Sequence, residues 1–519
     1  MRIEHVDLAE TECFSSIFID YIQQKDSLKP FYKSFPDVET FGELIKERQL
    51  SPQNRLILEN VIFEQYGALQ PREAVTQNIH DLSDSKTFTV TTGHQLNIFT
   101  GPLYFIYKIA TAINACNQLK AAYPDYNFVP VYWMASEDHD LEEISHFNLF
   151  GKSYKWETNQ TGPVGRMIPH SLNQIIDQLP EDVPLFEKAY LDNSNLTDAV
   201  RYYVHELFGN HGLVVIDAAD SRLKSIFSPI IEKDLFENKA NELVNETSNR
   251  LNEAGYKTQA FSREINFFYM EKGLRSRIVR EDGVFKVLDT DKTFTDEEIK
   301  KLLKEKPELF SPNVIMRPLY QETILPNIAY IGGPAEIAYW LQLKDVFEHH
   351  KKPFPALMPR VFGMIINKAI GKKIKKLKFS GTELFKPNHV LKEEYLKKHS
   401  DSEFDLHAEQ GEIGEVFEKI KQQAEEIDAS LTGFIGAEGA KALKSLENIS
   451  KRLKKAEEQN NETAMQQIDT VKEKLFPGGG LQERHDNFLN FYLNSPTFIE
   501  ILLHKFDAFA YQFHVLYDE

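Results

Sequence analysis

Hydrophobic positions follow two different periods along the chain. Between Lys86 and about residue 366, short runs of β-branched and aromatic residues alternate with stretches of helical spacing. The expected strands are 87–91, 128–134, 213–217, 328–331 and a last one near 361–366, and the expected helices are 103–119, 141–147, 221–254 and 335–347. Strands that alternate with helices in this way predict a parallel sheet covered by helices on its faces.

The segments around this alternation have other patterns. Residues 1–80 carry apolar side chains at helical spacing and predict an N-terminal helical cover. Residues 151–210 and 255–312 interrupt the alternation as insertions. In the second insertion, Gly273 and Asp282-Gly283 separate three short strand-like runs over 265–289, which predicts an antiparallel meander.

Beyond about Lys372 the strand pattern fades and two long helical patterns follow. Apolar residues recur at steps of three and four from Ile413 to Leu431 and again from Leu443 to Leu475. The glycines between them, at 433, 436 and 439, predict the bend of an antiparallel coiled-coil hairpin over 372–480. Its second arm would extend about 60 Å at 1.5 Å per residue, which favours a homodimer formed through the hairpin.

The predicted organisation therefore has three parts. A Rossmann-like core with its helical cover and insertions occupies 1–371, the hairpin occupies 372–480, and an aromatic helical tail, 481–519, is expected to pack back on the core. The fold class is α/β.

Composition narrows the compartment and the partners. A formal charge of -18 argues against a nucleic-acid surface, because such surfaces concentrate Lys and Arg, and it favours small-molecule partners. Two cysteines, Cys13 and Cys116, cannot form a disulfide framework or a Cys-rich zinc site, which fits a reducing compartment. Neither a signal peptide nor a run of 18 apolar residues is present, so we expect a cytoplasmic protein without membrane contact.

The first group of candidate residues follows the first expected strand. It comprises Thr92, Gly93, His94 and Gln95, with Thr100 and Gly101 before the next helix. A glycine turn after a strand lets backbone N–H groups approach phosphate oxygens, and His94 could donate to a phosphate. The alternative is a plain strand-to-helix turn that His94 caps.

The second group follows the second strand directly. After Trp133 come Glu137, Asp138, His139 and Asp140, at a strand end where open α/β sheets bind ligands. These groups could hold an amine, relay its proton or bind a divalent metal. Asp140 with Glu143 could instead cap the following helix, and we interpret the other three as functional. His146 would lie one helical turn further on and is interpreted as structural.

The third group surrounds the strand at 328–331. Gly332 and Gly333 permit close backbone approach, and Glu336 in the first helical turn could either complement the helix dipole or contact a ligand. Tyr339 and Trp340 could be ligand contacts or core. Upstream, Asn313, Arg317 and Glu322 interrupt an apolar stretch, and Arg317 could clamp a carboxylate or phosphate or form a structural ion pair.

Common catalytic signatures are missing from the sequence. It contains no Walker P-loop, no His-Glu-x-x-His zinc motif and no Gly-x-Ser-x-Gly nucleophile elbow. Gly411-Glu412-Ile413-Gly414 lies in a helical pattern and does not indicate a dinucleotide-binding site. The three groups above therefore carry the chemical interpretation.

Taken together, these blocks resemble the bacillithiol-synthesis cysteine-adding family. The matching segments are Thr92–Gln95 with Thr100–Tyr104, Trp133–Asp140, Arg317–Leu319 with Gln321-Glu322, and Gly332–Trp340, followed by the hairpin. The resemblance implies a core similar to class I aminoacyl-tRNA synthetases and a ligase that joins L-cysteine to glucosaminyl-malate, with the cysteine carboxylate activated by ATP as an acyl-adenylate.

The resemblance also implies roles for these residues. Gly93 and His94 would hold phosphates, the 137–140 string would orient cysteine or deprotonate the attacking amine, and Arg317 would meet an anionic group. The expected catalytic residues are His94, Glu137, Asp138, His139 and Asp140. The expected nucleotide contacts are Thr92, Gly93, Gln95, Thr100, Gly101, Gly332 and Gly333, and the expected substrate contacts are Trp133, Arg317, Glu322, Glu336, Tyr339 and Trp340.

Two features depart from related enzymes. Only Gly93-His94 matches the synthetase His-x-Gly-His signature, and no Lys-rich signature loop lies near Met358–Arg360. Two scattered cysteines cannot supply the zinc site with which mycothiol-pathway ligases hold the cysteine thiol, so no zinc is expected and Trp133 would select the thiol by packing. The need for magnesium stays open.

Two other interpretations stay open. The first is a metal-dependent hydrolase that uses Asp138, His139, Asp140 and His146, which predicts stoichiometric metal and activity lost with a chelator. The second is a non-catalytic scaffold whose hairpin binds a partner protein, which predicts no stabilisation by ATP or cysteine.

Overall fold

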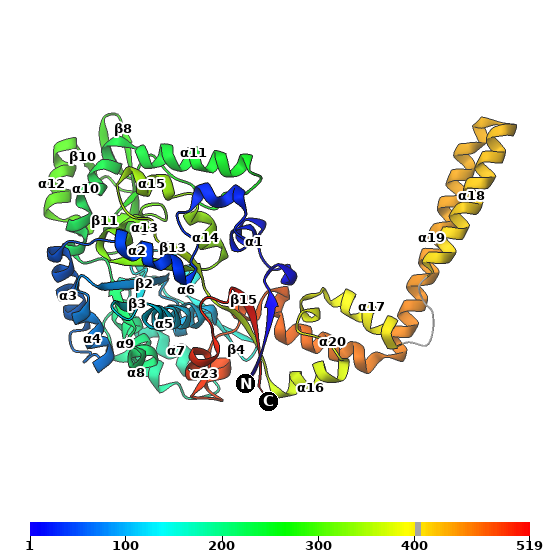
Figure 1. The fold of residues 1–519 in the computed structure, drawn as a ribbon, viewed down its shortest axis with the longest axis horizontal. Coiled ribbons are helices and arrows are strands. Elements are labelled where there is room, and N and C mark those ends of the chain that lie inside the picture. Colours follow the sequence, from blue (N-terminus) through cyan, green and yellow to red (C-terminus); the bar gives the residue numbers. More distant parts are fainter. Residues whose placement is uncertain (400–405, 519) are drawn as a thin grey trace. The chain divides into compact units, whose positions relative to one another are not determined.

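A computed structural model describes residues 1–399 and 406–518 of the chain. The chain divides into two compact units (Figure 1). The larger unit comprises His5–Met364 and Leu481–His514, and the smaller unit comprises Met1–Glu4, Ile365–Gly480 and Val515–Glu519. The candidate chemistry lies in the larger unit.

A five-stranded parallel sheet forms the centre of the larger unit. Its strands are β2 (Thr87–His94), β3 (Asn127–Met134), β6 (Val214–Asp217), β12 (Asn327–Gly332) and β13 (Ala356–Pro359). They pair in the order β13-β12-β2-β3-β6, and every pair is parallel. The predicted parallel sheet is confirmed, because strands whose side chains are apolar on both faces need cover on both faces.

The order of the strands reverses beside β2. From β2 the chain adds β3 and then β6 on one side, and it later returns to add β12 and β13 on the other side. The connections on the two sides of β2 therefore diverge, which leaves a crevice outside the carboxyl ends of β2 and β12. This is where open α/β sheets bind ligands.

The predicted last strand near 361–366 is wrong for this sheet. The fifth strand is β13, whereas β14 (Phe362–Ile366) joins a separate sheet in the order β1-β15-β14, with β1 (Arg2–Asp7) and β15 (Gln512–Tyr517). Both β13 and β14 are entirely buried, so hydrophobicity alone does not separate them.

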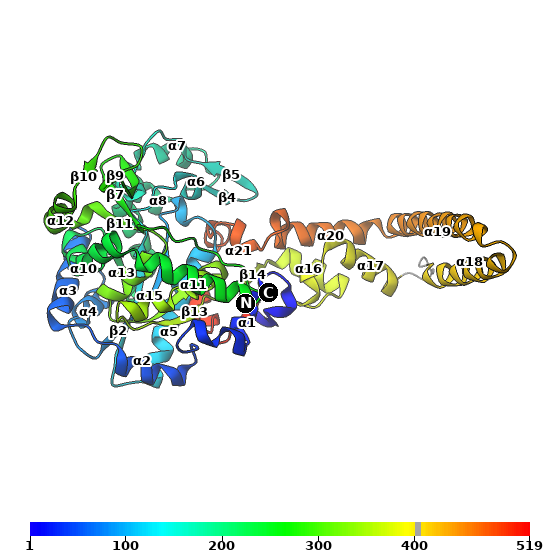
Figure 2. The same ribbon diagram turned by 90° about the horizontal axis from the view of Figure 1, so that it is seen from above.

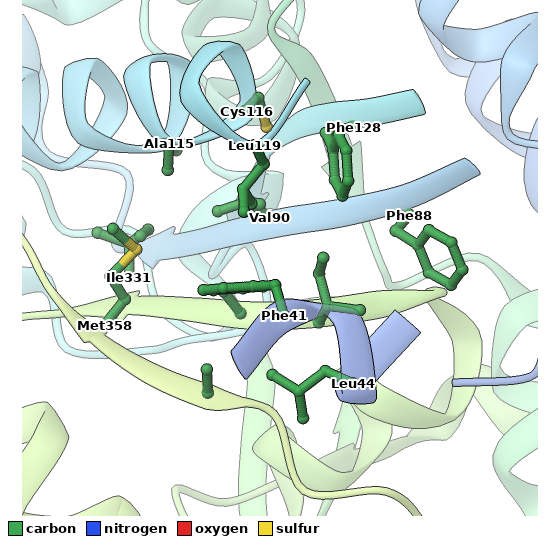
Figure 3. Packing of buried hydrophobic residues seen from close by; sticks show 14 of the residues in the cluster. Phe41, Leu44, Phe88, Val90, Ala115, Cys116, Leu119, Phe128, Ile331 and Met358 are labelled. Atoms are coloured by element: carbon green, nitrogen blue, oxygen red, sulfur yellow. The ribbon is translucent and has the colours of Figure 1, made fainter. Parts of the chain in front are cut away.

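The core beside the sheet is built by α5 (Tyr104–Ala122) and α2 (Phe41–Glu47). In Figure 3, side chains of these helices meet those of β2, β3, β12 and β13. The labelled members are Phe41, Leu44, Phe88, Val90, Ala115, Cys116, Leu119, Phe128, Ile331 and Met358. Helix α5 is apolar around nearly its whole circumference, which is the pattern of a helix buried on all sides.

The N-terminal region is mainly helical, as predicted, but it opens with β1. Its longer helices are α1 (Ser16–Ile22), α3 (Pro52–Tyr66) and α4 (Glu73–Asp81). The first insertion carries α8 (Pro184–Asp192) and α9 (Leu196–Phe208). The predicted helix over 221–254 is two helices, α10 (Ser221–Glu237) and α11 (Lys239–Glu253), because Asn238 between them has a left-handed φ of 53°.

The predicted meander is confirmed and has two further strands. The strands β7 (Phe267–Glu271), β8 (Leu274–Glu281) and β9 (Val284–Val287) are joined by β10 (Thr293–Phe294) and β11 (Phe310–Pro312). The order is β10-β9-β8-β7-β11, and every pair is antiparallel.

In the smaller unit, α18 (His407–Ile427) and α19 (Thr432–Asn460) pack side by side as a hairpin (Figure 2). The chain reverses at a short turn, Ala429–Leu431, where the Asp428 carboxylate accepts from Ser430 N. The glycines expected at the bend lie inside α19 instead. At Gly439 an added Cβ would lie 3.1 Å from Phe417, so this glycine brings the two helices close together.

The second arm is shorter than predicted. It breaks at Asn461, and α20 (Glu462–Leu475) packs instead on α16 (Lys368–Leu377) and α17 (Asn388–His399). Across the described residues, no helix is both long and apolar enough to cross a membrane.

Residues 481–514 return to the larger unit. Helix α23 (Phe498–Lys505) packs on α5, where Asn114 Nδ2 donates to Leu503 O (3.0 Å) and to Phe506 O (2.8 Å). A buried carboxylate, Glu483, pairs with Arg360 Nη2 at 2.5 Å. The last segment of the unit is therefore joined to α5 and to the end of β13.

Candidate functional site

The carboxyl ends of the parallel strands border two pockets in the larger unit. One lies at the reversal of strand order and is lined by the ends of β2 and β12 and the start of α14 (Pro334–Trp340); we call it the switch-point pocket (about 400 Å³). The other lies between the end of β3 and the meander; we call it the meander pocket (about 470 Å³). Four residues line both pockets: Trp133, Ala135, Val314 and Arg317.

A buried lysine, Lys108, lines the switch-point pocket. Lys108 Nζ lies 2.5 Å from Glu336 Oε2 and donates to Gly93 O at 2.8 Å. Tyr330 and the Gly333 N–H also donate to Glu336. Burial alone would raise the pKa of Glu336, but the Lys108 charge and these hydrogen bonds outweigh it and lower that pKa. Glu336 is therefore an ionised carboxylate that fixes both α14 and Lys108.

His94 faces the same pocket as a neutral ring. Burial, reinforced by the Lys108 charge, lowers its pKa to about 3. Its ring lies against Tyr104 and Phe105, and its buried Nε2 has no hydrogen-bond partner within the described chain. His94 Nε2 can therefore form a hydrogen bond with a bound ligand, but the imidazole ring is uncharged at neutral pH.

Arg317 forms part of the wall between the two pockets. Its guanidinium lies over the rings of Trp133 (5.9 Å) and Tyr330 (5.4 Å), and Nη1 donates to Gln321. Its buried Nη2 has no hydrogen-bond partner among the residues that the structure describes. No carboxylate of residues 1–399 and 406–518 forms an ion pair with it, so the structural ion pair considered from the sequence is not formed.

Two basic residues that the sequence interpretation missed complete the switch-point pocket. Arg360, directly after β13, lies over the Tyr104 ring, and Arg484 lines the pocket from the returning segment. Lys108 is paired with Glu336 and Arg360 with Glu483. Arg317 and Arg484 form no ion pair with a described carboxylate, and they outnumber the one remaining acidic lining residue, Glu143. In an acidic protein, this pocket is suited to an anion.

Lys108 could have been found in the sequence, because it is the one charged residue among the first sixteen positions of an otherwise apolar helix. Lys224, also missed, carries no such signal, because α10 contains other charged residues.

The acidic residues that follow β3 have different hydrogen-bond and ion-pair partners. Glu137 is held by Lys224, whose Nζ lies 2.7 Å from Oε1, and by Ser311 Oγ at 3.0 Å. Asp138 accepts from Gln95 Nε2 at 2.8 Å. Burial would raise the pKa of Asp138, but the Gln95 hydrogen bond and the charge of Arg275 outweigh it, so the pKa is lowered and the group is an ionised carboxylate.

His139 and Asp140 lie at the surface. His139 Nδ1 accepts from Arg275 Nη1 (2.7 Å), and burial together with that positive charge lowers the pKa of His139. Asp140 accepts from Glu143 N and caps α6 (Leu141–Ile144), as predicted, but the Glu143 side chain accepts from Gln95 Nε2 (2.7 Å) and does not complete the expected capping box. The expected helix over 141–147 ends at Ile144, and His146 lies exposed in β4 (His146–Leu149).

Several predicted site residues lie outside both pockets. Thr92 donates to Ile331 O, and Gly332 is buried behind Glu336. Thr100 and Gly101 form a tight turn in which a Cβ on Gly101 would lie 2.7 Å from Asn97. Their predicted contact with a nucleotide is not supported by this placement.

Two predicted substrate contacts also line neither pocket. Glu322 is buried in an ion pair with Arg48, and Trp340 is a core residue stacked on Tyr330 at 4.6 Å. The predicted residues that do line the pockets are Gly93, His94, Gln95, Trp133, Glu137, Asp138, Arg317, Gly333, Glu336 and Tyr339. His139 and Asp140 border a shallow surface hollow beside them.

Two protein-family models match consecutive parts of the chain. Residues 1–361 match the model described as "Bacillithiol biosynthesis BshC, N-terminal Rossmann-like domain". Residues 363–517 match the model described as "Bacillithiol biosynthesis BshC, C-terminal coiled-coil domain".

Curated relatives are similar over nearly their whole length. A protein of Cytophaga hutchinsonii is 42% identical over 506 residues, which cover 97% of each chain. A protein of Flavobacterium psychrophilum is 43% identical over 506 residues, 95% of each chain, and one of Salinibacter ruber is 28% identical over 96% of each. All three carry the name "Putative cysteine ligase BshC".

Proposed function

The chain belongs to the BshC family of bacillithiol biosynthesis, and from that premise we propose that it is a ligase that joins the carboxyl group of L-cysteine to the amine of glucosaminyl-malate. The observation that carries the proposal is the pair of cation-lined pockets that share the wall formed by Trp133 and Arg317. An anionic nucleotide in one pocket and the anionic glucosaminyl-malate in the other can both reach that wall.

We assign the nucleotide to the switch-point pocket. This is the position at which doubly wound sheets bind nucleotides, and Lys108, Arg360 and Arg484 supply positive charge there. ATP, with magnesium, would supply the activation of the cysteine carboxylate. His94 Nε2, which has no hydrogen-bond partner in the described part of the chain, would form a hydrogen bond with the bound nucleotide.

The wall residues would hold cysteine. Arg317 still has a buried N–H group for a carboxylate, and Trp133 offers an aromatic surface on which the thiol could pack. On the meander side, Asp138 is ionised and would accept a proton from the amine as the new amide bond forms and the activating nucleotide group leaves the cysteine carboxyl carbon. Glu137 is held by Lys224 and Ser311 and acts by positioning.

The two alternative interpretations are less well supported by the geometry. For a metal-dependent hydrolase, His146 is in the wrong element, and Arg275 places a positive charge beside Asp138 and His139. No group of three or more metal-ligating side chains is found in the described residues. A scaffold would not need two pockets with unpartnered polar groups.

We further propose a homodimer formed through the hairpin and a cytoplasmic location. The hairpin helices expose large apolar side chains, which a second copy would cover. They are Val416, Ile420, Ile427, Phe434, Ile449 and Leu453. The cytoplasm is the compartment favoured by a chain with only two cysteines.

The test is a reaction of the purified protein with ATP, magnesium, cysteine and glucosaminyl-malate, with bacillithiol followed by mass spectrometry and each component omitted in turn. We expect His94→Gln and Asp138→Asn to reduce the rate by roughly 10²-fold or more without a large change in melting temperature. His146→Gln is the matched control and should retain full activity. Absence of product from the folded protein would contradict the proposal, and stoichiometric bound metal in that protein would favour the hydrolase.

A further inference from the structure

The meander pocket contains arginines that have no acidic partner. Arg277 on β8 and Arg263 before β7 both line this pocket. Neither guanidinium forms an ion pair with any carboxylate in the part of the chain that the structure describes. Arg317, in the shared wall, likewise forms no ion pair with a described carboxylate.

The acidic groups of this pocket are already satisfied. Glu137 is held by Lys224 and Ser311, and Asp138 by Gln95 and Arg275. An arginine that lines a pocket without a carboxylate partner provides paired N–H donors suited to a carboxylate. The pocket thus has an excess of positive charge with no internal counterpart.

The side chain of a third arginine, Arg275, is held by several contacts in this pocket. The Arg275 side chain is 8% exposed, lies 4.0 Å over the Phe268 ring, and donates to Ser311 Oγ (3.1 Å) and Pro312 O (3.2 Å). Arg277 lies two residues further along β8, with its backbone paired to Phe268. This places Arg277 on the same face of β8 as Arg275.

An exposed aromatic ring borders the same pocket. Phe261 is 75% exposed although it lines the pocket. The backbone of the preceding residue, Ala260, is held in place by Gln342. Gln342 Oε1 accepts from Ala260 N (2.9 Å), and Gln342 Nε2 donates to Ala260 O (2.9 Å). A large apolar side chain held at the mouth of a pocket is suited to cover the uncharged part of a ligand.

We propose that the meander pocket is the acceptor site, in which Arg277 and Arg263 bind the carboxylates of the malyl group and Phe261 covers the sugar. The identity of this acceptor rests on the proposed function. The amine would then lie toward Asp138 and the wall at Arg317. The specificity for a dicarboxylate thus comes from the meander insertion, not from the parallel sheet.

The test measures equilibrium binding by calorimetry, with the full-length chain and three probes: glucosaminyl-malate, L-malate and glucosamine. Arg277→Gln should weaken glucosaminyl-malate binding by at least about 10-fold, because it removes a charge-assisted bidentate contact. Arg277→Lys should weaken it less, since the charge is kept. The control Lys272→Gln removes an exposed charge from the turn between β7 and β8 and should have no effect.

Glucosamine should bind more weakly than glucosaminyl-malate to the wild-type protein, and its affinity should not depend on Arg277. The inference is overturned if Arg277→Gln binds glucosaminyl-malate as the wild type does, if glucosamine binds equally tightly, or if no malate-bearing probe binds. Product formation separates the two proposals. Bacillithiol synthesis with an unchanged acceptor KM in Arg277→Gln would refute this site alone, and Arg277-dependent binding without synthesis would refute the ligase function alone.

Discussion

The neutral state of His94 has a measurable consequence for stability. A histidine with a pKa near 6.5 in the unfolded chain and about 3 in the folded protein is protonated first in the unfolded state as the pH falls. The unfolded state then binds more protons, so the free energy of unfolding decreases with decreasing pH. The contribution of His94 to the free energy of unfolding is fully present above about pH 7 and is lost progressively as the pH falls toward 3.

The size of the effect follows from the same two pKa values. Between pH 7.5 and 5.0, His94 alone lowers the free energy of unfolding by about 2 kcal/mol. Glutamine does not titrate in this range, so His94→Gln should lose about 2 kcal/mol less than the wild type over that interval. Other titrating groups contribute equally to both proteins and cancel in the comparison.

Urea denaturation followed by tryptophan fluorescence provides the assay. All three tryptophans, Trp133, Trp156 and Trp340, lie in the larger unit, so the signal reports on the unit that contains His94. His146→Gln is the control for replacing a histidine in the same unit. If the wild type and His94→Gln lose the same stability between the two pH values, His94 is not held neutral and the reasoning fails.

Two further predictions concern packing. Gly436→Ala in α19, where an added Cβ meets nothing within 4 Å, should stabilise the hairpin by roughly 0.5–1 kcal/mol in a circular-dichroism melt, whereas Gly439→Ala should not, because its Cβ would lie 3.1 Å from Phe417. Equal gains for both would show that the helices are not in close contact there. Glu322→Gln should destabilise the larger unit by about 3–5 kcal/mol in urea, because Arg48 stays buried without its partner; a loss below 1 kcal/mol would contradict this.

The sequence predicts the parallel sheet well and its last strand poorly. Strands β2, β3, β6 and β12 are recognisable because each is a short buried run between turn residues. The run from Ala356 to Ile366 is apolar apart from Arg360 and Gly363, and it contains both β13 and β14. Its division between two sheets depends on pairing with β15 near the C-terminus, which no local pattern reveals.

The candidate site shows the same limit. Adjacent residues in a helix point in directions about 100° apart, so Tyr339 lines the switch-point pocket while Trp340 enters the core. The sequence motif contains both and cannot separate them. Arg360 and Arg484 reach the site from segments far apart in the chain, and only the tertiary structure brings them together.

The return of residues 481–514 to the larger unit has a consequence for synthesis. A ribosome makes Ile365–Gly480, the segment that contains the hairpin, after the end of β13 is complete and before the segment that pairs with Arg360 and covers α5. At 5–20 residues per second, this delay is roughly 6–23 s. During that time the Asn114 amide and the Arg360 guanidinium lack their final partners. The larger unit can therefore complete its core only after nearly the entire chain has emerged, so the order of synthesis along the chain differs from the order in which its parts can finish folding.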